Sequence, residues 1–454
     1  MKKQMNWRKQ QFVPKSARDE QMYQLNSIEE LPKSELYSVI CNGREVPVYH
    51  TEFFDYVLLV IHKSEPLYFH IGIHEEAEKI QIRPLNIKKD FTRTEDGIEL
   101  CMDKPEKLVV EIDDDLLRPL YLLCAYYIEK PEGVTYYFQK GKIYNVNCLT
   151  LHSNDTVYIE EGSVVCGRFY SRMADNIRIV GNGILYGGVW HNWDENSGEQ
   201  MILPVLGNHI YIEGISIADG GSWGIVPVAC KDVTVRNVNV MSKVITGDGI
   251  DIVGSEDVLV EGCFIRANDD CISIKGFGNF DPSGSSDVKR VLVKDSIFWN
   301  AEFGNALEIG YETHCAEICD IRFENCDILH CEYEGNQSGG VLTIHNADRA
   351  HVHDIYYSNI RIEDAQEKFI DIKTLDSKYS TDRRRGMVSD VYFKDIEITG
   401  GIFPVSIIRG YEMHNELCRP RHFVFDNVVI LGKKIMNKND MRMVVELADD
   451  LKFQ

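Results

Sequence analysis

The sequence predicts an all-β protein in which a right-handed parallel β-helix (a solenoid) follows a small β-sandwich domain. Three observations support this fold class: an eight-residue pattern that recurs through the later part of the chain, short apolar runs before it, and hardly any stretch with helical periodicity. The expected organisation is an N-terminal arm at 1–34, the sandwich at 35–133, the β-helix at 134–440 and a C-terminal cap or tail at 441–454.

The sandwich is predicted by seven apolar runs that are rich in Val, Ile, Leu and Tyr and separated by turn-forming or charged residues. Short strands at this spacing are typical of an antiparallel β-sandwich. Residues 130–133 (KPEG) then supply a chain breaker and a domain boundary. The runs are ELYSVICN, FDYVLLVIH, PLYFHIGI, KIQIRPLNI, GIELCM, KLVVEID and PLYLLCAYYI.

The β-helix is predicted by a degenerate unit of the form apolar-x-apolar-x-(Asp/Asn/Gly)-x-x-apolar, whose starts lie 23 to 36 residues apart. One coil cannot bury its apolar face alone, so successive coils must stack and share one core. The polar or Gly position in mid-unit suits a bend between two short strands, and the crossover rule makes the coil right-handed. The units begin at Ile177, Ile210, Val233, Val258, Val291, Ile321, Ile355, Val391 and Phe423.

The composition argues against a nucleic-acid-binding, membrane or secreted protein. The 454-residue chain has a net charge of −22, which disfavours nucleic acid as a partner. No run approaches the ~20 apolar residues of a membrane helix, and the basic N-terminus lacks the apolar segment of a secretory signal. The 13 cysteines are odd in number and lie mostly in strand-like runs, so we expect core-filling thiols in a cytoplasmic protein without a membrane partner.

Two acidic segments lie one coil apart in the predicted β-helix. Asp248 and Asp251 precede the apolar segment VLVEGCFI, whereas Asp269 and Asp270 follow it. Asp248 and Asp269 are 21 residues apart, close to the shortest repeats, so we expect neighbouring coils about 4.8 Å apart. Like charges at that distance hold a shared proton, which suits glycoside hydrolysis by an acid and a carboxylate. Alternatively, these are ordinary turn residues that cap backbone amides.

The two segments, TGDGID at 246–251 and NDDCISIK at 268–275, resemble those of the polygalacturonase family, glycoside hydrolase family 28. The resemblance implies a right-handed parallel β-helix and inverting hydrolysis. It also implies that Asp269 is the general acid, while Asp248 and Asp270 hold and deprotonate the attacking water.

Other segments depart from the family pattern. In GNALEIGYE, Asn305 stands where the family has a histidine. In DIKT, Lys373 is kept but Asp371 replaces an arginine, and this segment arrives about one coil late, as if a rung were inserted near 341–363. The family's arginine and lysine are associated with binding a uronate carboxylate, which an aspartate would repel. The polygalacturonate substrate is therefore in question.

The layout of a β-sandwich followed by a β-helix is similar to that of the dextranase family, glycoside hydrolase family 49. This second resemblance implies hydrolysis of neutral α-glucans by three catalytic aspartates, two of which are adjacent in an Asn-Asp-Asp segment. The separation of the two acidic segments fits family 28 better.

Further candidates for substrate contact are aromatic or polar. Trp190, Trp193 and Trp223 lie in Gly-rich loops and either stack on sugar rings or pack the loops. His345 lies between the segments of Asn305 and Lys373 and is the best candidate to replace the missing histidine. Lys275 is expected to pair with the carboxylates or to lie on the cleft floor. Further expected substrate-binding residues are Asp251, Asn305, Asp371 and Lys373. The remaining histidines show no tight metal spacing, so neither a metal nor a cofactor is expected.

The sequence thus favours an inverting glycoside hydrolase acting on an oligosaccharide, with exo-action favoured by long loops at 279–289 and 375–385. The alternatives are a dextranase-like hydrolase of neutral glycans, a Ca²⁺-dependent polysaccharide lyase and a non-catalytic glycan-binding β-helix. The sequence is also compatible with a homo-oligomer.

Overall fold

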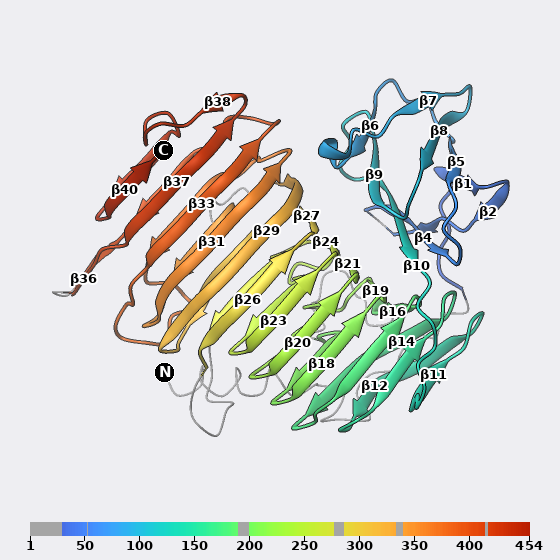
Figure 1. Ribbon diagram of the computed structural model, residues 1–454, viewed down its shortest axis with the longest axis horizontal. Helices are drawn as coiled ribbons and strands as arrows, with labels where there is room; N and C mark the ends of the chain where they lie inside the picture. The colour runs from blue at the N-terminus through green and yellow to red at the C-terminus, as the bar shows by residue number, and fades with distance from the viewer. Residues whose placement is uncertain (1–29, 52, 189–198, 277–285, 333–338, 414–415) are drawn as a thin grey trace.

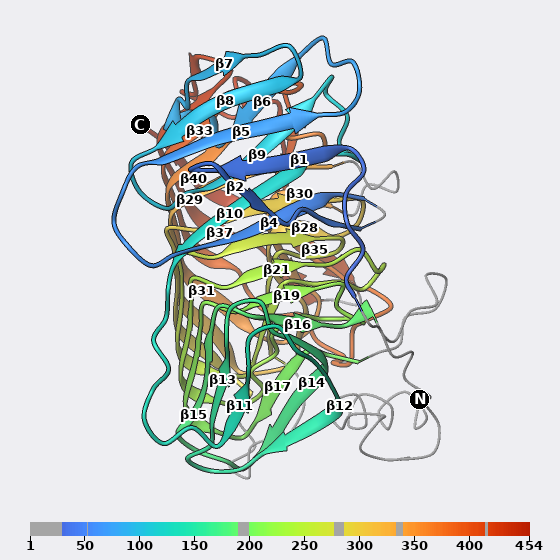
Figure 2. The same cartoon turned by 90° about the vertical axis from the view of Figure 1, so that its right-hand side faces the viewer.

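The computed structural model describes residues 30–51, 53–188, 199–276, 286–332, 339–413 and 416–454. These ranges are built from strands, with one short 3₁₀ helix, η2 (Leu85–Ile87), so the predicted all-β class is confirmed. A small sandwich lies beside a long parallel β-helix, as two views show (Figures 1 and 2). No helix within the described ranges has the length and apolarity needed to cross a bilayer.

The sandwich contains two sheets, each of five strands among the described residues, in the orders β2-β1-β5-β8-β7 and β3-β4-β10-β9-β6. All seven predicted apolar runs form strands, whose inward side chains fill a core between the sheets. The pairing is antiparallel except between β10 and β4, which run parallel. The strands are β1 (Tyr37–Cys41), β2 (Arg44–Val46), β3 (Tyr49–His50), β4 (Asp55–Ile61), β5 (Leu67–Ile73), β6 (Ile80–Arg83), β7 (Phe91–Arg93), β8 (Gly97–Met102), β9 (Lys107–Ile112) and β10 (Leu120–Tyr126).

The long sheet that faces the viewer in Figure 1 runs from β11 to β40 and pairs 21 strands of the described chain, nearly all in parallel. Its strands are β11 (Tyr136–Phe138), β12 (Ile143–Leu151), β13 (Thr156–Ile159), β14 (Val164–Arg172), β15 (Ile177–Gly181), β16 (Ile184–Tyr186), β17 (Ile202–Val205), β18 (Asn208–Glu213), β19 (Ser216–Ala218), β20 (Lys231–Arg236), β21 (Asn239–Met241), β23 (Glu256–Glu261), β24 (Phe264–Ala267), β26 (Val288–Lys294), β27 (Ile297–Asn300), β29 (Glu317–Cys331), β31 (His351–Ile362), β33 (Ser389–Ile398), β37 (Arg421–Ile430), β38 (Lys433–Lys434) and β40 (Asp449–Phe453).

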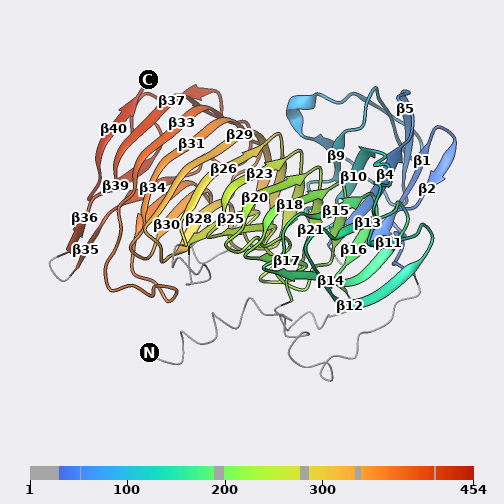
Figure 3. The same ribbon diagram turned by 60° about the horizontal axis from the view of Figure 1, so that its bottom comes forward.

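A second parallel sheet forms another wall of the same solenoid, and most of its strands are labelled in Figure 3. It is called the cleft sheet below, because the acidic segments lie at its edge. Its described strands are β22 (Ile250–Val253), β25 (Ile272–Gly276), β28 (Asn305–Thr313), β30 (Gly340–Asn346), β32 (Lys368–Thr374), β34 (Ser406–Arg409) and β39 (Met443–Glu446), and a small hairpin joins β35 (Tyr411–Met413) to β36 (Glu416–Cys418).

The predicted units stack in register. Each predicted start pairs with the next along the chain, from Ile177 with Ile210 through to Val391 with Phe423. The mid-unit position bends as expected: Asn325 and Asn359, for example, have φ of 51° and 53°. Asn tolerates this left-handed conformation and Gly adopts it freely, which explains the Asp/Asn/Gly restriction at this position.

The same register stacks aromatic side chains inside the later coils. The rings of Tyr357 and Phe393 are 5.1 Å apart at 3°, and those of Phe393 and Phe425 are 4.9 Å apart at 1°. Phe323 and Phe453 extend this ladder at its two ends. Because an offset of one residue would turn these rings outward, the ladder fixes the register of the coils.

The sandwich is joined to the β-helix by a buried ionic network. His330 is 2% exposed and contacts Glu111 of the sandwich through Nε2 (2.7 Å) and Asp364 through Nδ1 (2.9 Å). Arg83 joins Glu111 (2.9 Å) to Glu363 of the β-helix (2.8 Å). Buried charges are tolerated only when they are paired in this way, so the network fixes how the two parts dock.

This network predicts a pH-dependent stability. Burial lowers the pKa of His330, but its bonds to Asp364 and Glu111 outweigh this effect and raise the pKa above its usual value. Burial likewise opposes the bonds of Glu111, yet His330 and Arg83 leave the Glu111 pKa lowered. The Glu111 contribution is therefore complete above about pH 4.3 and lost as pH falls through the lowered pKa. The His330 contribution is complete below about pH 6.5 and lost as pH rises through the raised pKa.

We expect His330→Gln to lower the free energy of unfolding by about 3 to 5 kcal/mol. The difference from the wild type should be largest between about pH 4.3 and 6.5, where both contributions are complete. Denaturant unfolding across pH measures it, with the exposed His209→Gln as control. An equal loss of stability at every pH would contradict the ionic account.

Candidate active site

Three carboxylates meet at the edge of the cleft sheet. Ile250 of β22 pairs with Ile272 of β25, so Asp248 lies level with Asp270 on the next coil. The backbone confirms this level, because Gly249 N donates to Asp270 O at 2.8 Å. Asp269 precedes Asp270 and lies beside Gly304 of the following coil, where a Cβ at the glycine would collide with the Asp269 carboxylate.

The three carboxylates differ in burial. Asp248 and Asp270 are 2% and 7% exposed, whereas Asp269 is only half-buried. Burial, followed by the neighbouring Asp251, raises the pKa of Asp248 well above its usual range. Burial, followed by the neighbouring Asp269, does the same to the pKa of Asp270. The cluster therefore favours holding protons at a pH where isolated carboxylic acids have lost them.

Lys275, on the cleft floor, favours the ionised form of the neighbouring carboxylates. Its Nζ contacts Asp251 Oδ1 at 2.6 Å and Asp248 Oδ2 at 3.1 Å, and it lies 4.0 Å from the centre of the Trp223 ring. These carboxylates outweigh burial and hold the pKa of Lys275 well above its usual value, while the ammonium in turn lowers the pKa of Asp248. Because Asp251 is fully buried, its geometry suits holding Lys275 rather than touching a ligand.

Asn305 supports Asp270. It is the first residue of β28, one coil beyond Asp270, and its Nδ2 donates to Asp270 Oδ1 at 2.8 Å. An amide N–H stabilises the ionised carboxylate, so Asn305 opposes part of the rise in the Asp270 pKa that burial and Asp269 cause. Asn305 thus contacts the acidic cluster directly, although an amide cannot exchange a proton as an imidazole does.

A second charged group continues along the same face of the cleft sheet. Outward positions of successive strands pair Ser273 with Glu308, then Thr343, then Asp371. His345 lies between the two acids: its Nδ1 is 3.0 Å from Glu308 Oε1 and its Nε2 is 3.4 Å from Asp371 Oδ2. All three ionisable groups are fully buried. Burial lowers the pKa of His345, but the two acids more than compensate and raise it to about 9.

Lysines and an aromatic ring surround this group. Lys373 and Lys368 contact Asp371 Oδ2 at 2.8 and 3.3 Å, so Asp371 pairs with the nearby cations instead of leaving them open to an anion. The Tyr311 ring stacks on His345 with centroids 4.4 Å apart at 12°. β30 lies between β28 and β32 in the cleft sheet, so the segment of Lys373 lies two strands beyond that of Asn305.

The remaining predicted contacts divide into two groups. Trp223 is half-buried at the acidic cluster, with the Lys275 ammonium over its ring. Trp190 and Trp193 lie outside the described residues. Glu308 was not predicted from the sequence, although strand alternation places it at the same outward position as Asp251 and Asp371.

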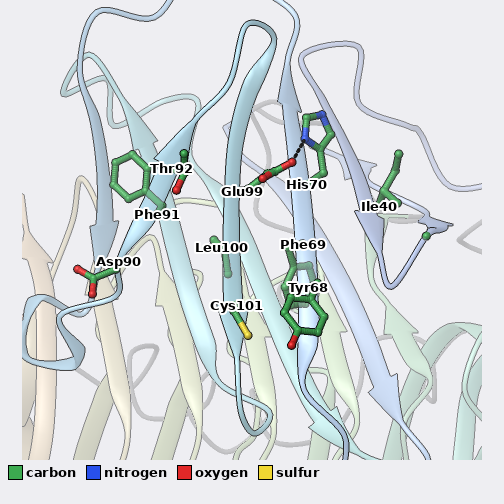
Figure 4. Close-up of a pocket in the computed structure, with 11 residues that line it drawn as sticks. Ile40, Tyr68, Phe69, His70, Asp90, Phe91, Thr92, Glu99, Leu100 and Cys101 are labelled. Carbon is green, nitrogen blue, oxygen red and sulfur yellow. Dashed lines mark ion pairs between the residues drawn. The ribbon is translucent and has the colours of Figure 1, made fainter.

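A surface hollow of about 520 Å³ lies elsewhere, on the outer face of the sandwich (Figure 4). Tyr68, Phe91 and His70 line it, and Glu99 points toward His70. It contains none of the predicted site residues, so it does not belong to the acidic cluster.

The part of the chain that contains this site resembles a known protein family. Residues 174–399, which include both acidic segments, match the model of glycosyl hydrolases family 28. A probable polygalacturonase of Arabidopsis thaliana is 21% identical over 199 residues, which cover 43% of this chain and 40% of the relative. The match therefore spans about two fifths of that relative's length.

Solved structures share the fold across almost the whole chain. Dex49A from Penicillium minioluteum has a TM-score of 0.65 at 13% identity, covering 92% of both chains. A family 28 exopolygalacturonase from Yersinia enterocolitica has a TM-score of 0.53 at 11% identity, covering 94% of this chain and 95% of that one. The β-helix of this chain therefore resembles family 28 over residues 174–399, within an overall fold shared with Dex49A.

Proposed function

We propose that this protein is an inverting glycoside hydrolase that acts on an oligosaccharide of neutral sugars. The observation that carries the proposal is the level pairing of Asp248 and Asp270 on adjacent coils, with the more accessible Asp269 beside them. Two buried carboxylates can hold one water between them, and a third on the open side can reach a leaving group.

Each carboxylate then has one role. Asp269 gives its proton to the glycosidic oxygen as the bond between that oxygen and the anomeric carbon breaks. Asp248 and Asp270 orient a water, whose oxygen bonds to the anomeric carbon from the opposite face and whose proton passes to the carboxylate pair. Burial raises the pKa of Asp248 and of Asp270, and Lys275 and Asn305 oppose that rise, so both residues support the ionised forms that the base role requires.

The charges along the cleft sheet support a neutral substrate. A uronate needs a cation able to pair with its carboxylate. Here Lys275, Lys373 and His345 already contact buried protein carboxylates. A uronate in this part of the cleft would compete with Asp371 and face repulsion from it. Sugar hydroxyls, by contrast, can both donate to carboxylates and accept from ammonium groups.

The loop at 375–385 supports exo-action on a short substrate. Tyr379 of this loop reaches Tyr311 of the cleft sheet, with ring centroids 5.5 Å apart, and Ser380 Oγ donates to Ala347 O at 2.6 Å. The loop is thus fastened beside the C-terminal ends of β28 and β30, next to the charged face, where it would limit how far a glycan chain extends. The lyase alternative is less favoured, because the Lys275 ammonium occupies the space between Asp248 and Asp251 that Ca²⁺ would take.

We expect Asp269→Asn to lower kcat on a neutral oligosaccharide by about 10²- to 10⁴-fold, because the amide cannot protonate the leaving oxygen. Release of reducing ends measures the rate. Asp257→Asn is the matched control, since Asp257 is exposed on the same coil and pairs with Arg290 outside the cleft. Full activity of the Asp269 variant would rule out this residue as the acid.

Removing the Lys275 charge should shift the pH profile. Because the ammonium lowers the pKa of Asp248, Lys275→Gln should raise that pKa and move the acid limb of kcat/KM upward by about 1 to 3 pH units. Lys231→Gln, at an exposed position, is the control. An unmoved acid limb in a folded Lys275 variant, checked by its thermal melt, would contradict the electrostatic role.

Substrate preference should respond to Asp371. The wild type should hydrolyse neutral oligosaccharides with a kcat/KM at least about tenfold above that for uronic ones, since one unpaired buried charge costs more than 1.4 kcal/mol. Asp371→Asn releases Lys373 and Lys368 from their shared carboxylate and should raise the uronic-to-neutral ratio. Preference of the wild type for uronic substrates would refute the neutral assignment.

A further inference from the structure

A cluster of different side chains lies on the long sheet, away from the cleft sheet. Glu317 and Cys319 project from β29 and His353 projects from β31, all half-buried. Cys319 pairs in register with His353, which makes the two direct cross-strand neighbours. One ligand atom from each of the three residues lies within 4.8 Å of the other two. The cluster therefore brings a thiol, an imidazole and a carboxylate to one point.

Its spacing also fits a tetrahedral metal. His353 Nε2 lies 3.4 Å from Glu317 Oε2, which is long for a hydrogen bond between these two groups. Two ligands held about 2.1 Å from one metal ion at a tetrahedral angle are themselves about 3.4 Å apart. The sulfur of a thiolate, about 2.3 Å from the same ion, reaches the third corner within the observed limit.

The histidine is also oriented for this purpose. His353 Nδ1 is 2.7 Å from Asp354 Oδ2, a carboxylate outside the cluster. A carboxylate on one ring nitrogen fixes the tautomer and leaves the other nitrogen, here Nε2, with its lone pair toward Glu317 and Cys319. The same arrangement holds metal-ligating histidines in many proteins.

We propose that Glu317, Cys319 and His353 bind one Zn²⁺ ion, with a fourth position open to water. The ligand set of sulfur, nitrogen and oxygen suits Zn²⁺ rather than Ca²⁺ or Mg²⁺, which take oxygen ligands. Lys289 contacts Glu317 through Oε1 and also contacts Asp287 at 3.3 Å. The other oxygen of Glu317, which faces His353, remains the metal ligand.

A second cluster of potential ligands differs from this one in its neighbouring cation. His314, Asp348 and Asp382 also lie within ligand distance of one another. There, however, Arg349 Nη1 contacts Asp382 at 2.8 Å and the His314 ring at 2.9 Å. The guanidinium contacts both the carboxylate and the ring of that cluster. Lys289, by contrast, forms an ion pair with Glu317 alone of the three proposed ligands in the described part of the chain, although its charge also acts on Cys319.

Titration of the intact protein with Co²⁺ tests the proposal, because tetrahedral Co²⁺ reports its geometry and a thiolate ligand through visible and near-ultraviolet absorption. We expect one equivalent to bind with a thiolate band, Zn²⁺ to displace it, and Cys319→Ser and His353→Gln each to weaken binding about tenfold or more. The matched controls are Cys101→Ser, an exposed cysteine of the sandwich, and His209→Gln, an exposed histidine of the same long sheet.

Binding without a thiolate band, or unchanged affinity in the Cys319 variant, would overturn the proposal. If the variants do not fold, alkylation of the wild-type cysteines with and without Zn²⁺, followed by mass spectrometry, still tests the site. Zn²⁺ should protect Cys319 but not Cys101, and equal protection of both, or of neither, would refute the site. These readouts are independent of hydrolytic activity.

Discussion

The in-register stacking of parallel strands is the constraint on which the rest of this molecule depends. Inward aliphatic and aromatic side chains set the register, because a shift by one residue would expose the whole apolar face. Once that register is set, every outward position lies about 4.8 Å from its equivalents on the neighbouring coils. Residues far apart in sequence, such as Asp248 and Asp270, become neighbours without any contact of their own to bring them together.

Stacking also forces like charges together, and the solenoid offsets this cost with buried opposite charges. Lys275 lies among the carboxylates of the acidic cluster, and His345 lies between Glu308 and Asp371. Core packing therefore provides rigidity, while ionic pairs determine which carboxylates hold a proton and which cations remain for a ligand. In our proposal, the same pairs set both the chemistry of the first cluster and the neutral preference of the second.

The fold was predictable because its signal is periodic. The unit starts, the mid-unit bends and the seven sandwich strands all follow from apolar alternation and turn chemistry, and the structure agrees with each. The parallel pairing of β10 with β4 was not predicted, because strand direction leaves no mark on alternation. The adjacency of the two acidic segments followed from the repeat length alone.

Side-chain partnerships were harder to predict. Glu308 belongs to no local motif, and its place in the charged group follows only from its pairing with the strands on either side. The contact of His330 with Glu111 joins two parts of the molecule that no repeat relates. Cys319 and His353 do leave a signal in the sequence, since each lies two residues before a predicted unit start. The two residues are far apart along the chain, however, so only the strand register shows that they are neighbours.

The central claim is that a water held by Asp248 and Asp270 attacks directly, without a covalent intermediate. The most direct test is proton NMR of the first-formed product from an oligosaccharide of known anomeric configuration, recorded before mutarotation. The account predicts inversion at the anomeric carbon. Retention would contradict it, because retention requires one of these carboxylates to act as a nucleophile.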